Sequence, residues 1–264
     1  MTSPGSRDIV ADNISQFLVV DGVRLEMEIW KGEGSPILLL HEGLGSVAMW
    51  RDFPARLAAV LRHPVLAWSR RGYGLSDHLS AARAPDYMHQ EANAVIHFMD
   101  VLAIERAVLF GHSDGGSIAL ITAAYSPERI AALILEAPHV YVEQLTVDSI
   151  AATRRVYATT NLREQLARHH SDPDRVFWAW NDIWLDARFR DWSIEDLLPA
   201  IRAPALLIQG QDDKYGTIDQ IDRIARALPH TRRLELVRCG HSPHRDQPRA
   251  VLNAAAAFLE EYGV

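Results

Sequence analysis

The hydrophobic pattern of the chain changes after Trp30. Before it, apolar and polar residues alternate on both sides of Asp21-Gly22, a strong turn signal, so residues 17–20 and 23–30 are predicted to pair as an antiparallel hairpin. After it come short, continuously apolar segments, which are typical of strands buried on both faces of a parallel sheet. These segments are residues 36–40, 64–68, 107–110, 132–135, 205–208 and 234–237.

Helical patterns lie between the apolar segments. Residues 86–102 place apolar side chains at three- and four-residue steps, and residues 117–125 and 249–260 are rich in alanine. Alternating strands and helices predict an α/β sheet with right-handed crossovers. With the hairpin, the sheet is expected to have about eight strands, most of them parallel.

One interval breaks this alternation. Residues 140–198 contain no convincing strand, only helix-like segments at 149–157 and 177–185. An insert of this length is too long for an ordinary loop, so it is predicted to form a helical unit of its own. Its place between two late strands predicts that it lies over the carboxyl ends of the sheet, where ligands bind.

The composition is typical of a globular protein and argues against several classes of partner and location. Hydrophobic residues make up 48% and charged residues 23% of the 264 residues, with a net charge of −7 and no basic run, which argues against a nucleic-acid partner. Residues 1–8 lack the features of a secretory signal, and no apolar run approaches the roughly 18 residues that span a membrane. Cys239 is the only cysteine, which favours a cytoplasmic location.

The stretch Gly111-His112-Ser113-Asp114-Gly115 fits the pattern G-x-S-x-G between a predicted strand and a predicted helix. In that context the pattern indicates a nucleophile elbow with Ser113 as the nucleophile. The two glycines leave room for the sharp turn, and the helix N-terminus favours developing negative charge. Asp114 lies one position beyond the nucleophile, so it is not expected to attack.

A base and an acid follow in the order expected for such a nucleophile. His241 stands on a glycine-bearing loop after the last predicted strand, and Asp212 and Asp213 follow the strand 205–208. An imidazole needs a carboxylate to hold its tautomer. His244 is expected to be solvated, or at most to support the neighbouring site. No ligand cluster with zinc-like spacing is visible, so no metal and no cofactor are predicted.

Two further motifs accompany the nucleophile, acid and base: Leu39-Leu40-His41-Glu42-Gly43-Leu44-Gly45 and Ser69-Arg70-Arg71-Gly72-Tyr73-Gly74. Together these motifs extend over essentially the whole chain. The chain resembles the α/β-hydrolase-fold serine hydrolases. The resemblance implies helices on both faces of the sheet, a core domain of residues 1–137 and 201–264, and a helical cap of residues 138–200. It also favours Asp213 over Asp212, because the acid of the family usually lies three residues after the glycine.

The resemblance implies an oxyanion hole as well. The donors are expected to be the backbone N–H groups of Gly43, with Leu44 as the second choice, and of Asp114. The family loop typically begins His-Gly, whereas here Glu42 follows His41.

Two interpretations of the Asp114 side chain stay open. Its carboxylate either caps the following helix or binds the substrate. The Ser-Asp-Gly-Gly elbow resembles that of valacyclovir-hydrolase-like esterases, which cleave amino-acid esters and whose acidic residue is associated with the ammonium group of the substrate. Glu42 is expected to add a second carboxylate. Leu44, Trp180 and Trp184 are further candidates for substrate contact, although cap packing is the alternative role for the two tryptophans.

The sequence therefore predicts a serine hydrolase that cleaves an ester-type bond of a small molecule, such as a carboxylic ester, an amino-acid ester or a lactone. Two alternatives stay open: hydrolysis of a carbon–carbon bond in ring-fission diketones, and a non-catalytic ligand receptor built on the same fold.

Overall fold

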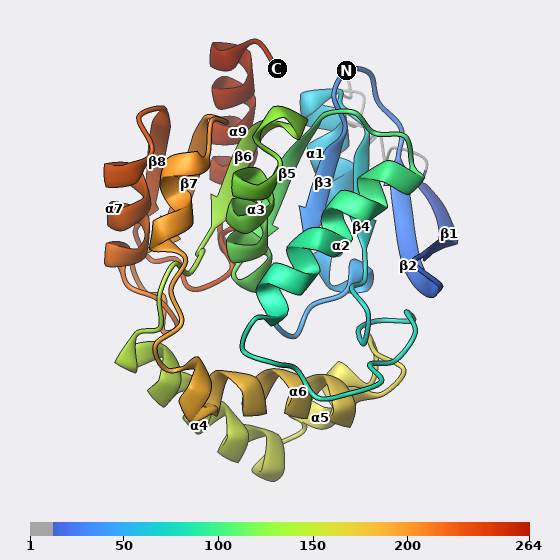
Figure 1. The fold of residues 1–264 in the computed structure, drawn as a ribbon, viewed down its shortest axis with the longest axis vertical. Helices are drawn as coiled ribbons and strands as arrows, with labels where there is room; N and C mark the ends of the chain where they lie inside the picture. Colours follow the sequence, from blue (N-terminus) through green and yellow to red (C-terminus); the bar gives the residue numbers. More distant parts are fainter. Residues whose placement is uncertain (1–12) are drawn as a thin grey trace, which may run out of the picture.

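The computed structural model describes residues 13–264, which form one sheet flanked by helices (Figure 1). The expectation that residues 1–8 carry no secretory signal concerns residues outside this range. The strands are β1 (Asn13–Val20), β2 (Val23–Trp30), β3 (Ile37–Leu40), β4 (Val65–Trp68), β5 (Ala107–His112), β6 (Ile130–Glu136), β7 (Ala205–Gly210) and β8 (Thr231–Leu236).

The sheet has eight strands in the order β1-β2-β4-β3-β5-β6-β7-β8. The pairs β1–β2 and β2–β4 are antiparallel, and all other neighbouring strands are parallel. The predicted hairpin and the mostly parallel sheet are both confirmed.

The last strand was predicted at residues 234–237, but β8 covers Thr231–Leu236. It is an edge strand, and several of its side chains face solvent, so it lacks the continuous apolar pattern of a buried strand. Val237 lies beyond the strand and is 58% exposed.

Nine α-helices accompany the strands in the described part of the chain. They are α1 (Phe53–Leu61), α2 (Tyr87–Val101), α3 (Asp114–Tyr125), α4 (Gln144–Thr159), α5 (Leu162–Leu166), α6 (Pro173–Leu185), α7 (Ile218–Ala227), α8 (Pro243–Asp246) and α9 (Pro248–Tyr262). Short 3-10 helices lie at Val47–Trp50, Pro127–Arg129, Ala187–Phe189 and Glu195–Ala200.

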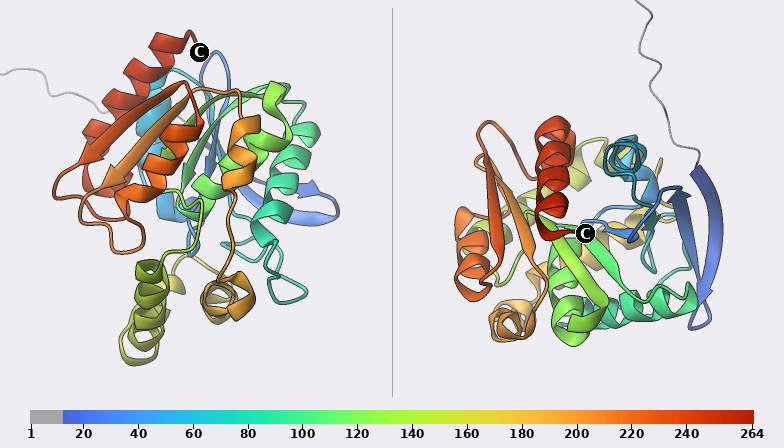
Figure 2. Two further views of the ribbon diagram at one scale, coloured as in Figure 1. Left: turned by 60° about the vertical axis from the view of Figure 1, so that its left-hand side comes forward. Right: turned by 90° about the horizontal axis from the view of Figure 1, so that it is seen from above.

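The sheet has a separate hydrophobic core on each face, and helices lie on both sides of it (Figure 2). Alternate side chains of β3 point to opposite sides, as the strand period requires. Leu38 and Leu40 pack in the core that includes residues of α2, α3 and α7, whereas Ile37 and Leu39 pack in the core that includes residues of α1 and α9. Helices therefore cover both faces.

The segment between β6 and β7 carries α4, α5 and α6, which gather beyond one end of the sheet, below the strands in Figure 1. Figure 2 shows the same separation from a second side. The predicted helical character of this interval is confirmed, and its only strand-like pairing is the single bridge between Tyr141 and Ser193. Within residues 13–264, no helix combines the length and the apolar character needed to cross a membrane.

The start of α3 approaches β3 and β5 very closely, and two glycines permit this. A Cβ atom on Gly115 would lie 2.0 Å from the carbonyl oxygen of Leu40, and one on Gly111 would lie 2.3 Å from the carbonyl oxygen of Gly115. Since these neighbours are backbone atoms, they cannot move aside as a flexible side chain would. Both outer glycines of the G-x-S-x-G pattern are thus required for helix–sheet packing.

We expect Gly115→Ala to lower the free energy of unfolding by about 1–3 kcal/mol, the usual cost of overpacking. Gly116→Ala is the matched control, because its Cβ would lie 3.0 Å from its nearest neighbour, Pro138, rather than 2.0 Å, so its effect should be smaller. Urea unfolding of both variants checks this. A Gly115→Ala protein as stable as the wild type would contradict the close approach.

Candidate active site

Ser113 stands alone between β5 and α3 in a strained conformation. Its φ is 55° and its ψ is −119°, a region that residues with a side chain rarely adopt. The turn is held by its backbone: the Ser113 N–H donates to the carbonyl of Glu136 at 2.9 Å, and its carbonyl accepts from the N–H of Gly116 at 2.8 Å. Such strain persists only where the surroundings fix it, and it clusters at functional sites.

His241 is hydrogen-bonded to Asp213. Its Nδ1 lies 2.9 Å and 2.8 Å from the two carboxylate oxygens, and the Asp213 side chain is 1% exposed. The same carboxylate accepts from the Tyr215 N–H and from the Gln209 side chain, both at 2.8 Å. Burial raises the pKa of Asp213, but the charge and hydrogen bond of His241 outweigh it and leave the pKa lowered. Asp213 therefore accepts from His241 as a carboxylate.

Asp212, the other candidate acid, lies on the outside of this turn. Its side chain is exposed, and its backbone N–H donates to the carbonyl of Cys239 at 2.9 Å. Among the residues that the structure describes, only Asp213 is hydrogen-bonded to the His241 ring.

Ser113 and His241 line the same cavity, which has a volume of about 610 Å³. Every candidate for substrate contact or for the oxyanion hole named from the sequence lines it too. These residues are Glu42, Gly43, Leu44, Asp114, Trp180 and Trp184. The cavity is also lined by residues of α4 and α5, so it lies between the sheet and the helical insert.

The Asp114 carboxylate is buried, with 1% of the residue exposed. It accepts hydrogen bonds from the Tyr87 hydroxyl at 2.9 Å and from the Trp184 indole N–H at 3.3 Å, and a guanidinium nitrogen of Arg70 lies 3.9 Å away. These bonds point away from the amides of α3, so the carboxylate is not a hydrogen-bonded helix cap. It instead joins the elbow to α2 and α6.

Trp180 and Trp184 both line the cavity and both belong to the hydrophobic core of that side. Trp180 packs directly on the loop after β3, because a Cβ on Gly43 would lie 2.3 Å from its indole ring. The two roles considered from the sequence, packing in the helical insert and lining the cavity, are therefore compatible, because Trp180 and Trp184 do both.

A charged pair of buried His112 and half-buried Glu42 adjoins the elbow. Nδ1 of His112 is 3.4 Å from a carboxylate oxygen of Glu42, and its Nε2 donates to the backbone carbonyl of His241 at 2.6 Å. Burial lowers the pKa of His112, but Glu42 outweighs it and raises the pKa to about 9. The pKa of Glu42 is lowered despite its own burial, chiefly by the nearby His112. Glu42 is thus an ion-pair partner of His112.

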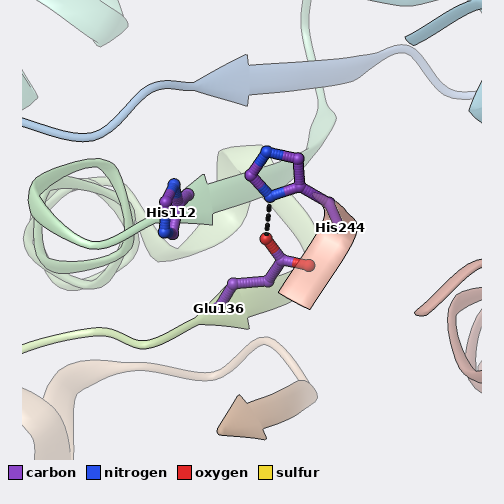
Figure 3. Close-up of side chains that lie close together, drawn as sticks. All are labelled: His112, Glu136 and His244. Carbon is purple, nitrogen blue, oxygen red and sulfur yellow. Dashed lines mark hydrogen bonds and ion pairs between the residues drawn. The ribbon is translucent and has the colours of Figure 1, made fainter. Parts of the chain in front are cut away.

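His244 is buried, and the expectation of a solvated loop residue was wrong. It is 4% exposed, and its Nδ1 lies 2.6 Å from a carboxylate oxygen of Glu136 (Figure 3). The pattern failed because α8, which carries His244, is too short to show a helical period and packs its Pro243 and His244 inward.

His112, Glu136 and His244 bring potential metal-binding atoms within 4.8 Å of one another, a grouping that spacing in the sequence did not indicate. The histidines come from β5 and α8, and Figure 3 shows the ring of His112 beside the hydrogen-bonded pair. His244 already donates to Glu136, and His112 to the carbonyl of His241. We interpret the cluster as a hydrogen-bonded support of the turn that carries Ser113.

His139 is a further cavity residue that the sequence analysis missed. It is 2% exposed. Its imidazole packs edge-to-face with the Trp184 indole, with ring centroids 5.2 Å apart. Burial, with the nearby His241, lowers its pKa to about 4. It lies three residues after the end of β6, which neighbours β5, so the topology that positions Ser113 also brings it to the cavity.

These histidines make the stability depend on pH in two directions. A further buried histidine, His170, accepts from the Gly74 N–H and donates to the Leu44 carbonyl, both at 2.9 Å. Burial lowers the pKa values of His139 and His170 to about 4, so their contribution is complete above pH 6.5 and is lost as the pH falls toward 4. The pKa of His112 is raised to about 9, so its contribution is present below pH 6.5 and is lost as the pH rises through 9. Stability should therefore be greatest near pH 6.5.

In a series of melting temperatures from pH 4 to 9.5, we expect His112→Gln to remove most of the decline above about pH 6.5, where the imidazole would otherwise lose its proton. His230→Gln, at an exposed position, is the control and should keep the wild-type profile. An unchanged alkaline decline in His112→Gln would contradict the assigned ion pair.

The chain is similar in sequence and in fold to known hydrolases. A model of the Alpha/beta hydrolase family matches residues 37–255. Serine hydrolase BPHL of Mus musculus is 28% identical over 214 residues, which cover 75% of this chain and 70% of that protein. The 2-hydroxy-6-oxononadienedioate/2-hydroxy-6-oxononatrienedioate hydrolase of Comamonas testosteroni is 24% identical over 237 residues, which cover 80% and 82%.

The solved structure of a membrane phospholipase A, described as a novel bacterial virulence factor, has a TM-score of 0.77 at 21% identity and covers 95% of this chain and 87% of that one. At this identity the likeness shows the fold alone. The family match extends from β3 into α9 and includes Ser113, Asp213 and His241. The chain belongs to the alpha/beta hydrolase family.

Proposed function

We propose that the chain hydrolyses an ester-type bond of a small molecule through an acyl-enzyme, with Ser113 as nucleophile, His241 as base and Asp213 as the acid that orients it. The observation that carries the proposal is that a strained Ser113 and an Asp213-bound His241 line one cavity. Substrates in this class include carboxylic esters, amino-acid esters and lactones.

The reaction has two halves. Ser113 Oγ attacks the carbonyl carbon while His241 takes its proton, and the imidazolium then gives that proton to the departing alcohol. In the second half His241 takes a proton from water, which attacks the acyl carbon, and the imidazolium returns the proton to Ser113. The Asp213 carboxylate holds Nδ1 protonated, which leaves Nε2 as the base. These steps use only groups of the chain, so the proposal needs no cofactor.

The oxyanion hole is assigned to the backbone N–H groups of Gly43 and Asp114. The assignment is supported by their hydrogen bonding: within residues 13–264, neither N–H donates to a protein acceptor outside regular helix bonding. Asp114 is the first residue of α3, where an N–H has no partner within its own helix. Both residues line the cavity beside Ser113.

We assign residues 138–200 to a cap over the core formed by residues 1–137 and 201–264. Support comes from the cavity, whose walls combine residues of the sheet loops with residues of α4, α5 and α6. Leu44, Trp180 and Trp184 supply apolar and aromatic surface for the acyl or alcohol part of the substrate. A cytoplasmic location stays a prediction from the single cysteine.

Hydrolysis of a carbon–carbon bond is the second candidate, because the relative from Comamonas testosteroni is named for a 2-hydroxy-6-oxo dioate substrate. The same nucleophile, base and oxyanion donors serve both reactions, so a panel of esters, lactones, thioesters and ring-fission diketones separates them.

An amine on the substrate is proposed as the partner of Asp114. A carboxylate has about four acceptor positions, and the bonds from Tyr87 and Trp184 use two of them. A desolvated ammonium group needs a paired anion, and Asp114 lines the cavity next to Ser113. Glu42 is a weaker candidate for this role because its cationic partner His112 is closer, at 3.4 Å, than Arg70 is to Asp114, at 3.9 Å.

Labelling with a fluorophosphonate tests the nucleophile. We expect one adduct on Ser113 in the wild type, no adduct in Ser113→Ala, and a fall of about 10⁴-fold in kcat for Asp213→Asn, the loss seen when the orienting carboxylate of such a triad is removed. Asp212→Asn is the matched control and should retain activity. Folded wild-type protein that takes no label would favour the non-catalytic receptor.

The role of Asp114 is tested with pairs of esters that differ only in an α-amino group. Asp114→Asn should lower kcat/KM for the amino ester by about tenfold or more relative to its partner, as expected when a charge-assisted hydrogen bond is lost. Equal losses on both esters would mean that Asp114 only supports the turn.

A further inference from the structure

Three arginines from separate segments line the active-site cavity. Arg51 follows the 3-10 helix Val47–Trp50, Arg168 lies just after α5, and Arg245 is in α8, four residues beyond His241. All three side chains are exposed, whereas Ser113 is 6% exposed, so they line the solvent side of the cavity.

None of these arginines is neutralised by a carboxylate. Many other arginines form ion pairs, as Arg83 does with Glu91 at 3.0 Å, but across residues 13–264 no carboxylate oxygen lies within 4.0 Å of the Arg51, Arg168 or Arg245 guanidinium. The chain as a whole has a net charge of −7. The unpaired positive charge at the cavity is therefore opposite in sign to the net charge of the chain.

The acidic residues of the cavity do not offset this charge, because each has a cation of its own. Glu42 pairs with His112 at 3.4 Å, and Asp114 has Arg70 at 3.9 Å. The cavity thus has internally balanced charges at its buried end and unbalanced positive charge at its solvent side.

His169, which follows Arg168 in the chain, also lines the cavity. Burial lowers the pKa of His169, and the charges of Arg51, Arg168 and Arg245 lower it further. Arg51 also has a strained backbone, with φ 56° and ψ −127°. Among cavity residues it shares a positive φ only with Ser113, and such strain is retained where a side chain must be aimed.

We propose that Arg51, Arg168 and Arg245 form a subsite for an anionic group, a carboxylate or a phosphate, carried by the part of the substrate remote from the bond that is cleaved. Guanidinium groups suit this chemistry because their planar fork matches carboxylate and phosphate oxygens. Positive charge at the entrance also draws an anionic substrate toward Ser113. The proposal rests on the proposed function and names the substrate class for the same site.

The test uses matched 4-nitrophenyl esters with acyl chains of increasing length. Each chain ends in a carboxylate, in a phosphate monoester or in a neutral carboxamide. For the best chain length we expect kcat/KM for an anionic ester to exceed that for its carboxamide by about tenfold at low salt, mainly through KM, and this preference to shrink as salt screens the charges. The carboxylate and phosphate series show which anion is preferred.

The variants are Arg51→Gln, Arg168→Gln, Arg245→Gln and the triple variant, with Arg106→Gln as the matched control. Arg106 is exposed and immediately precedes β5, at the end of the strand opposite Ser113. The triple variant should lose the anionic preference while its activity on carboxamide esters stays within about twofold of wild type. Equal kcat/KM for anionic and neutral esters in the wild type, or a preference that survives in the triple variant, would overturn the proposal.

Failure of the proposed function would be visible separately, as no turnover of any ester and no fluorophosphonate adduct. Calorimetric titration with glutarate and with glycerol phosphate then tests the subsite by itself. Binding that is lost in the triple variant but kept in Arg106→Gln supports it, and absence of binding to the wild type overturns it.

Discussion

The turn between β5 and α3 is the constraint on which the rest of the site depends. One residue, Ser113, reverses the chain at φ 55°, and α3 then passes so close to β3 that a methyl group on Gly115 would lie 2.0 Å from the Leu40 carbonyl. Strain of this kind costs about 1–3 kcal/mol and persists because the surrounding packing is specific. The packing of two cores on the sheet holds the turn, and the turn brings Ser113 and Asp114 to the cavity.

Electrostatics connects this turn to the loops around it. His112, directly before Ser113, pairs with Glu42 of the loop after β3 and donates to the carbonyl of His241, so one imidazole links the proposed oxyanion loop, the nucleophile strand and the loop of the proposed base. In the same cluster as His112, His244 and Glu136 brace β6, whose Glu136 carbonyl accepts from the Ser113 N–H. The charges at the buried end are thus used to hold geometry, which leaves the arginines at the solvent side available for a ligand.

The features that the sequence predicts well are those set by residues close together in the chain. The buried strands follow from apolar runs, and the glycine register alone singles out Ser113 before any contact is known. The short helices α5 and α8 were missed because a helix of four or five residues shows too little periodicity to detect. Pairings such as Glu42 with His112, or Asp114 with Tyr87 and Trp184, join segments far apart in the chain and leave no spacing signal. Arg51, Arg168 and Arg245 went unnoticed for the same reason, since each is unremarkable until the fold brings them to one cavity.

As the proposed nucleophile, Ser113 becomes covalently acylated during turnover. The most direct test is to mix the wild-type protein with a turned-over 4-nitrophenyl ester, quench with acid within milliseconds, and map the acyl mass by peptide mass spectrometry. We expect an acyl group on the peptide that contains Ser113, formed at least as fast as steady-state turnover and lost as product appears. Turnover with Ser113 unmodified at every time point, or with the acyl group on another residue, would contradict it.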